Sequence, residues 1–151
     1  MAELKDRLSN DLHAAMKARD ELTTSTLRMA LAAVRTAEVA GTEARELSDD
    51  EVLAVLTKEA KKRREAATAY ADAGRAELAD KERAEERILA RYLPAQLSDE
   101  ELTALVAKAL SGVDATGRGA MGQAMKAAQA AVAGRAEGAR VAAEVRRQLG
   151  M

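Results

Sequence analysis

The only proline of the chain, Pro94, is the feature that most limits how the chain can fold. Proline has no backbone N–H and its ring clashes with the preceding helical turn, so a helix that reaches it must end. Ser98 follows closely and stands three residues before a glutamate, which is the spacing of a capping box that starts a helix. We therefore expect a joint at residues 94–97 between an N-terminal subdomain, residues 1–93, and a C-terminal subdomain, residues 98–151.

The composition favours long helices that pack through small side chains. The chain has no Phe, Trp or Cys and two Tyr, and Ala, Glu, Lys, Leu and Arg dominate it. A β-sandwich would need β-branched and aromatic residues. The absence of cysteine excludes disulfides and thiolate chemistry, and a single histidine does not favour a zinc site. The expected fold class is all-α, with no metal and no cofactor.

Charge and hydropathy limit the partners. The first residues are charged and no apolar run is long enough to span a bilayer, so we expect a cytoplasmic protein without a membrane partner. The net charge is −1, but residues 112–151 hold six Arg or Lys against three Asp or Glu, a net of +3, which leaves −4 for residues 1–111. A basic tail on an acidic body is typical of a chain with an anionic partner.

Apolar spacing predicts seven helices. Leu4, Leu8, Leu12 and Met16 repeat every four residues, which is the period of one helical face. Asp20 can cap the next helix, and Ser48 with Glu51 forms a capping box like the one at Ser98. The second helix is expected to end near residue 41. Four further helices are expected to span about 49–73, 75–93, 98–112 and 120–133, and a last helix is expected to carry Val141, Val145 and Leu149.

The third and fourth of these helices are expected to form a long charged hairpin. Residues 61–64 are four consecutive cations, and a turn at Gly74 would bring them near Glu82, Glu85 and Glu86. The base of the hairpin should pack in the core, and its tip should project into solvent. Two interpretations stay open for the cations. They form either a solvated face paired with the acids, or a contact surface for phosphates, because four consecutive residues span the whole circumference of a helix.

Residues 117–122 match the G-x-G-x-x-G pattern of dinucleotide-binding sites. That site needs a preceding strand and a βαβ unit, and the sequence predicts a loop before this motif and no strand anywhere. We expect a flexible loop that opens a helix. The helix N-terminus can hold a phosphate beside Arg118.

Several short motifs in order resemble those of the GatB/YqeY family, in its stand-alone YqeY branch. The C-terminal ones are residues 121–126 (MGQAMK) and 134–138 (GRAEG), and the upstream ones are residues 25–29 (STLRM), 61–65 (KKRRE) and 92–98 (YLPAQLS). The resemblance covers essentially the whole chain. The departures are a short alanine-containing loop at residues 41–46 and Glu137, where related chains often have Asp.

The resemblance implies an all-helical protein of two subdomains and an RNA-related role. In the larger relative, the B subunit of the tRNA-dependent amidotransferase, a similar tail contacts tRNA while the catalytic part lies elsewhere. We therefore expect an accessory module that binds tRNA, or a tRNA-processing or aminoacylation enzyme, by contacts to phosphate. The expected contacts are Lys126 and Arg135, then Arg118, and as a second set Arg28, Lys61, Lys62 and Arg64.

Backbone geometry adds four residues to this expectation. Gly122, Gly134 and Gly138 would allow close backbone approach or set helix ends, and Pro94 would set the joint. No residue stands out as catalytic, and the chain alone is not expected to be an enzyme. Two alternatives stay open: a helical module that binds protein only, and a carbon–nitrogen ligase that uses glutamine as amido donor, as the family label would imply.

Overall fold

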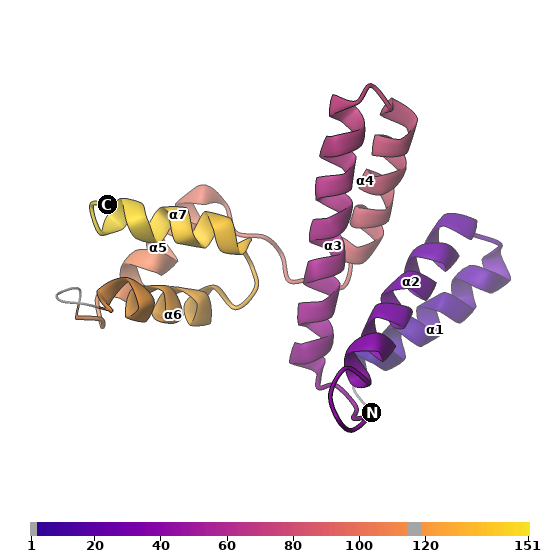
Figure 1. The fold of residues 1–151 in the computed structure, drawn as a ribbon, viewed down its shortest axis with the longest axis horizontal. Coiled ribbons are helices and arrows are strands. Elements are labelled where there is room, and N and C mark those ends of the chain that lie inside the picture. Colours follow the sequence, from indigo (N-terminus) through magenta and orange to yellow (C-terminus); the bar gives the residue numbers. More distant parts are fainter. Residues whose placement is uncertain (1–2, 115–118) are drawn as a thin grey trace. The chain divides into compact units, whose positions relative to one another are not determined.

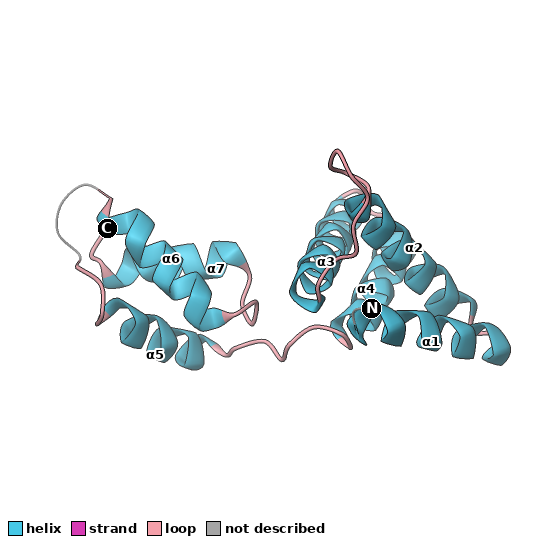
Figure 2. Cartoon of the chain, turned by 90° about the horizontal axis from the view of Figure 1, so that it is seen from below, coloured by secondary structure: helices cyan, strands magenta, loops and turns pink. Residues whose placement is uncertain are grey.

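The structure is a computed structural model that describes residues 3–114 and 119–151. Within these ranges it contains helices and no strand, so the all-α prediction is confirmed (Figures 1 and 2). The helices are α1 (Glu3–Ala18), α2 (Glu21–Glu38), α3 (Asp49–Asp72), α4 (Ala76–Ala90), α5 (Asp99–Leu110), α6 (Ala120–Val132) and α7 (Gly138–Gln148). The chain divides into two compact units, Met1–Leu93 and Pro94–Met151.

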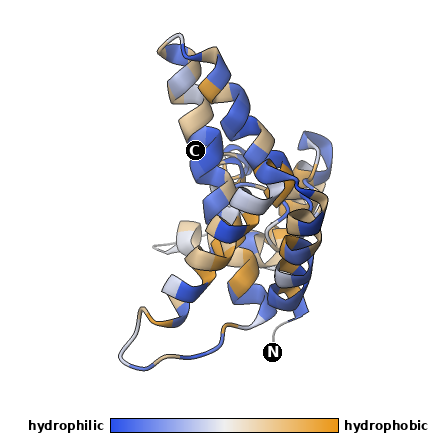
Figure 3. Cartoon of the chain, turned by 90° about the vertical axis from the view of Figure 1, so that its right-hand side faces the viewer, coloured by the Kyte–Doolittle hydropathy of each residue, from blue (hydrophilic) through white to orange (hydrophobic). Residues whose placement is uncertain are grey.

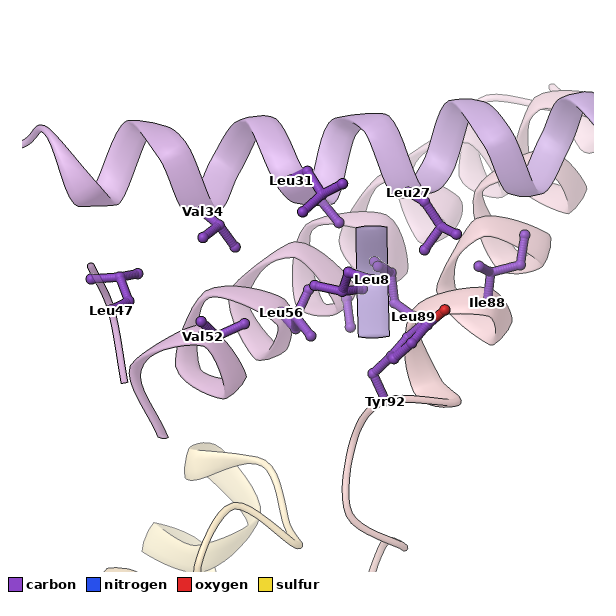
Figure 4. Packing of buried hydrophobic residues seen from close by; sticks show 12 residues of the cluster. Leu8, Leu27, Leu31, Val34, Leu47, Val52, Leu56, Ile88, Leu89 and Tyr92 are labelled. Carbon is purple, nitrogen blue, oxygen red and sulfur yellow. The ribbon is translucent and has the colours of Figure 1, made fainter. Parts of the chain in front are cut away.

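The first unit consists of two helical hairpins, α1–α2 and α3–α4, around one apolar core. Each helix contributes a fully buried leucine, and Figure 4 shows these side chains pointing toward one another: Leu8, Leu27, Leu56 and Leu89. Burying a leucine stabilises a fold by about 2 kcal/mol. The four leucines therefore explain why the two hairpins close on each other.

Capping residues begin α2, α3 and α5 where the sequence predicts. The carboxylate of Asp20 accepts a hydrogen bond from Thr23 N at 3.1 Å at the start of α2. Both predicted capping boxes are present, at Ser48 before α3 and at Ser98 before α5. In each case the leucine just before the cap is buried, which fixes the direction in which the chain enters the helix.

Two helices end earlier than predicted. We expected the second helix to reach residue 41, but α2 ends at Glu38, whose carbonyl accepts a hydrogen bond from Arg45 N at 3.0 Å instead of continuing the helix. We expected the fourth to reach residue 93, but α4 ends at Ala90. Tight turns follow, such as Tyr92 N to Leu89 O at 3.0 Å, because a residue just before proline avoids the helical conformation.

The outer half of the α3–α4 hairpin extends beyond the core, as predicted. Core residues of these helices stop at Ala60 and begin again at Ile88. Farther out, the buried apolar residues of the two helices are Ala67 and Ala79, and Gly74 turns the chain with a φ of +76°. Figure 3 shows this tip, at the top of the view, mainly in hydrophilic colours.

The second unit packs α5, α6 and α7 around a small core that is rich in Ala and Val. Ala124 and Ala128 of α6 are fully buried against valines of the other two helices, such as Val106 and Val145. Arg140 links α7 to the segment that begins α5. Its guanidinium donates hydrogen bonds to Leu97 O at 3.1 Å and to Asp99 Oδ1 at 2.9 Å. None of the described helices has the length and apolar character needed to cross a bilayer.

Candidate functional site

An exposed face of α6 holds two residues of the predicted site, Gly122 and Lys126. They lie four residues apart and therefore on the same side of the helix. Lys126 is exposed and has no hydrogen-bond or ion-pair partner among the residues that the structure describes. A Cβ placed on Gly122 would meet no atom within 4 Å. The chain itself therefore does not require a glycine there, and the face around it is open.

Gly134 and Gly138 have a different place, at the turn between α6 and α7. Gly134 adopts a φ of +78° directly after Ala133, whose φ is +50°, so these two residues end α6 in the left-handed conformation. Gly138 is the first residue of α7. The sequence predicted that these glycines set helix ends or allow close approach, and at the α6–α7 turn they lie at helix ends.

Arg135 is half-buried and holds the start of the second unit. Its Nε donates to Ala95 O at 3.3 Å, and its carbonyl accepts a hydrogen bond from Leu97 N at 2.8 Å. The segment that follows Pro94 is thus tied to the α6–α7 turn. Arg135 therefore has a structural role, whatever its remaining N–H groups bind.

The predicted contacts in the first unit already have partners. A terminal nitrogen of Arg28 lies 3.8 Å from Met16 Sδ. Lys61 and Lys62 pair within α3, with Glu65 at 3.9 Å and with Glu59 at 3.3 Å. Arg64 pairs across the hairpin with Glu86 at 2.9 Å.

Arg63 is the centre of a partly buried ionic cluster between α3 and α4. Its Nε lies 3.1 Å from Glu85 and 3.8 Å from Glu82, and its terminal nitrogen lies 3.5 Å from Glu59. Burial raises the pKa of Glu85, and the neighbouring Glu82 charge raises it further. The prediction that the cations of α3 lie near the acids of α4 is confirmed for Arg63 and Arg64 and not for the two lysines.

A groove with a volume of about 350 Å³ runs along another side of the same hairpin. Three arginines line it, Arg64, Arg83 and Arg87, together with one carboxylate and small or polar residues of both helices: Glu86, Ala67, Thr68 and Ala90. We call it the arginine groove. Arg83 lies 3.4 Å from Asp80, and Arg87 has no partner in the described part of the chain.

The sequence analysis missed Arg83 and Arg87. The signal was present, because Arg83 and Arg87 are four residues apart and so share one face of α4. The prediction for this helix concerned only its carboxylates, Glu82, Glu85 and Glu86.

Gly117 and Arg118, the first two residues of the G-x-G-x-x-G motif, lie outside the described residues. The described part begins at Gly119, which precedes α6 with a φ of +87° and without a side-chain cap. In the described ranges, no group of three or more His, Cys, Asp or Glu side chains is placed to hold a metal ion.

A family model described as Yqey-like protein matches residues 5–149, which is nearly the whole chain. A search of curated proteins found no match.

Proposed function

Because the chain belongs to the YqeY-like protein family, we propose that it is an accessory module that binds tRNA, alone or held by a tRNA-processing or aminoacylation enzyme. The contacts are made to phosphates, and the proposal assigns no catalytic step to the chain. It rests on the resemblance of the C-terminal motifs to a tail that contacts tRNA in the larger relative. The observation that carries it is the exposed α6 face with Gly122 and Lys126.

The charges of the second unit support a phosphate contact at Lys126. Arg140 pairs with Asp99, and Arg147 pairs with Glu144. Lys126 has no such carboxylate, so its charge is available to an outside partner. A cation that neutralises a phosphate releases a bound counterion, which makes affinity depend on salt.

Gly122 supports a close approach of that partner. A helix with glycine in its interior is less stable than the same helix with alanine there, by about 0.5 kcal/mol or more. At Gly122 no neighbouring atom excludes a side chain, so packing does not explain the glycine. The first turn of α6 therefore exposes backbone beside Lys126. A bulky backbone such as that of RNA can come closer to such a turn than to one covered by side chains.

The protein-binding alternative predicts an exposed apolar patch on α6. Met121 and Met125, the large apolar residues of its first two turns, are partly buried against the core of the second unit. What α6 exposes instead is glycine, glutamine, lysine and alanine. This surface lacks the large apolar anchors that dominate protein–protein interfaces.

The test measures binding of the full chain to total tRNA across a salt series. We expect Lys126→Ala to lower the slope of log affinity against log salt by about 1. Gly122→Ala should weaken binding while leaving the fold as stable as before or slightly more stable. The matched control is Lys108→Ala, which removes an exposed lysine from α5 of the same unit and should change nothing.

Two results would overturn the proposal. One is absence of tRNA binding by the wild type even at low salt. The other is binding that responds to Lys108→Ala as strongly as to Lys126→Ala, because the interaction would then be unspecific charge attraction.

A further inference from the structure

We infer that the arginine groove of the α3–α4 hairpin is a second contact surface, which holds the phosphate backbone of the bound RNA. The inference rests on the proposed function for the identity of the RNA. The surface itself lies in the other unit and is independent of α6. No residue of the groove except Arg64 was among the predicted contacts.

The hairpin separates its charges between two sides. Three of its carboxylates, Glu59, Glu82 and Glu85, gather around Arg63. On the groove side, one carboxylate, Glu86, stands among three arginines. Glu86 pairs with Arg64, and Arg83 lies 3.4 Å from Asp80, an exposed carboxylate that does not line the groove. Arg87 has no carboxylate partner in the described part of the chain. The groove is therefore a local basic surface on a segment of the chain that is acidic in sum.

The net negative charge of residues 1–111 does not prevent such a contact. Salt screens charges over about 8 Å at physiological ionic strength, so a phosphate in the groove responds mainly to the nearest groups. Side chains of Arg64 and Arg83 are 44% and 48% exposed, and can turn toward a ligand without leaving a buried site.

The arrangement of the arginines suits a chain of phosphates better than a single one. Arg83 and Arg87 are one helical turn apart, which corresponds to a rise of about 6 Å along α4. Arg91 stands four residues later, directly after the end of α4, and does not line the groove. Each guanidinium offers a planar fork of N–H donors that matches two phosphate oxygens. The groove thus presents donors at successive heights along one line.

The remaining lining favours a nucleic-acid backbone over a peptide. The apolar residues of the groove are Ala67 and Ala90, which form no pocket for a large side chain of a protein partner. No aromatic residue lines the groove, so it offers no surface on which bases stack. The chemistry that remains is contact with phosphates, which positions an RNA without reading its sequence.

The test uses NMR on the full chain titrated with a tRNA transcript. The Nε–Hε signals of Arg83 and Arg87 are assigned from the single variants Arg83→Gln and Arg87→Gln, and the backbone amides of α6 are followed in the same titration. We expect the arginine signals to shift. The double variant should raise the Kd for tRNA about tenfold at low salt. Lys81→Gln, an exposed lysine of α4 that does not line the groove, is the matched control.

Each outcome decides between the two surfaces. In one outcome the α6 amide signals shift, the arginine signals of the groove do not, and the double variant keeps the Kd of the wild type. This outcome overturns the inference and leaves the proposed function standing. Arginine shifts and a raised Kd without any α6 response support the groove and reject the α6 surface. Silence at both sites rejects both.

Two further titrations test the ligand class. Inorganic phosphate at an equal concentration of phosphate groups should shift the arginine signals much less than tRNA does. If it shifts them equally, the groove is a site for single phosphate ions and the inference is wrong. In a competition experiment, poly-glutamate should displace labelled tRNA much less effectively than unlabelled tRNA does. Equal displacement would also overturn the inference, in favour of an acidic protein partner.

Discussion

The hydroxyl of Tyr92 donates a hydrogen bond to Asp11 Oδ2 at 2.5 Å, so the last residues before the proline are fastened to α1. Arg7 lies over the Tyr92 ring at 4.6 Å from its centre and donates to Arg91 O at 3.3 Å. The ring itself is buried in the core of the first unit. The chain therefore leaves this unit at a fixed point.

Replacing Tyr92 by Phe removes that hydrogen bond and keeps the ring. We expect a loss of about 1 kcal/mol in the free energy of unfolding. The hydrogen bond to Asp11 is lost, while the packing of the ring in the core stays the same. Urea unfolding measures the change. Tyr70→Phe, which alters an exposed tyrosine of the α3–α4 tip, is the control. Equal stability of Tyr92→Phe and the wild type would show that the contact contributes nothing.

Tyr92 should resist ionisation at high pH. Burial and the hydrogen bond to Asp11 raise the pKa of Tyr92 above its ordinary value of about 10. Because the pKa of Tyr92 is raised in the folded chain, the contribution of its protonated hydroxyl to stability is complete below pH about 10. This contribution is lost as the pH rises above that value. In an ultraviolet titration, Tyr92→Phe should abolish the absorbance change that appears at the highest pH. An unchanged titration curve in this variant would contradict the assignment.

The second unit should weaken in acid through Glu144. Hydrogen bonds from Arg147 and then Gln148 lower the pKa of Glu144 to about 2. The contribution of the Glu144 carboxylate to stability is therefore complete above its pKa in the unfolded chain, about 4.3. This contribution is lost as the pH falls toward 2. Gln148 also donates to Thr103 O at 2.9 Å, so the cluster links α7 to α5. Glu144→Gln should flatten the dependence of stability on pH in this range, as unfolding followed by NMR of α7 amides would reveal.

Gly122 and Gly134 should respond oppositely to replacement by alanine. Gly134 has a φ of +78°, where a Cβ is strained, so Gly134→Ala should cost about 1 kcal/mol. Gly122 is helical and open, so Gly122→Ala should be neutral or stabilise by about 0.5 kcal/mol. Thermal unfolding of the two variants side by side checks the sign. A destabilising Gly122→Ala would mean that the position has a constraint inside the chain.

Removing Arg63 should destabilise the first unit more than removing Arg64. Arg63→Met leaves three carboxylates, Glu59, Glu82 and Glu85, without their shared cation, which should cost about 2 kcal/mol at pH 7. Lowering the pH to 5 should recover part of the loss, because Glu85, whose pKa is raised by burial, can then take up a proton. Arg64→Met, at a more exposed pair, should cost less than half as much. Equal losses, or no recovery in acid, would contradict the cluster.

The sequence was sufficient for features that depend on neighbours along the chain. The capping boxes at Ser48 and Ser98 and the cap at Asp20 follow from local spacing, and so does the turn at Gly74. The ends of α2 and α4 were less predictable, since the end at Glu38 involves a contact with Arg45, seven residues later.

The candidate sites depend on contacts between helices and were predicted less well. Nothing in the sequence distinguishes Arg63 from Arg64, although one is surrounded by carboxylates and the other lines a groove. Arg135 looked like a free cation, yet it donates to Ala95, 40 residues earlier. Gly122 and Gly134 also look alike, and only their φ angles and surroundings separate them.

The outer half of the α3–α4 hairpin has a consequence for how chains of this fold can vary. Since Ala67 and Ala79 are buried only between the two helices, matched insertions or deletions of whole turns in both would leave the core of the first unit intact. The hairpin is in this sense an arm of adjustable length. Changing that length would move its basic side along the arm, and so would alter the reach of the protein without redesigning its fold.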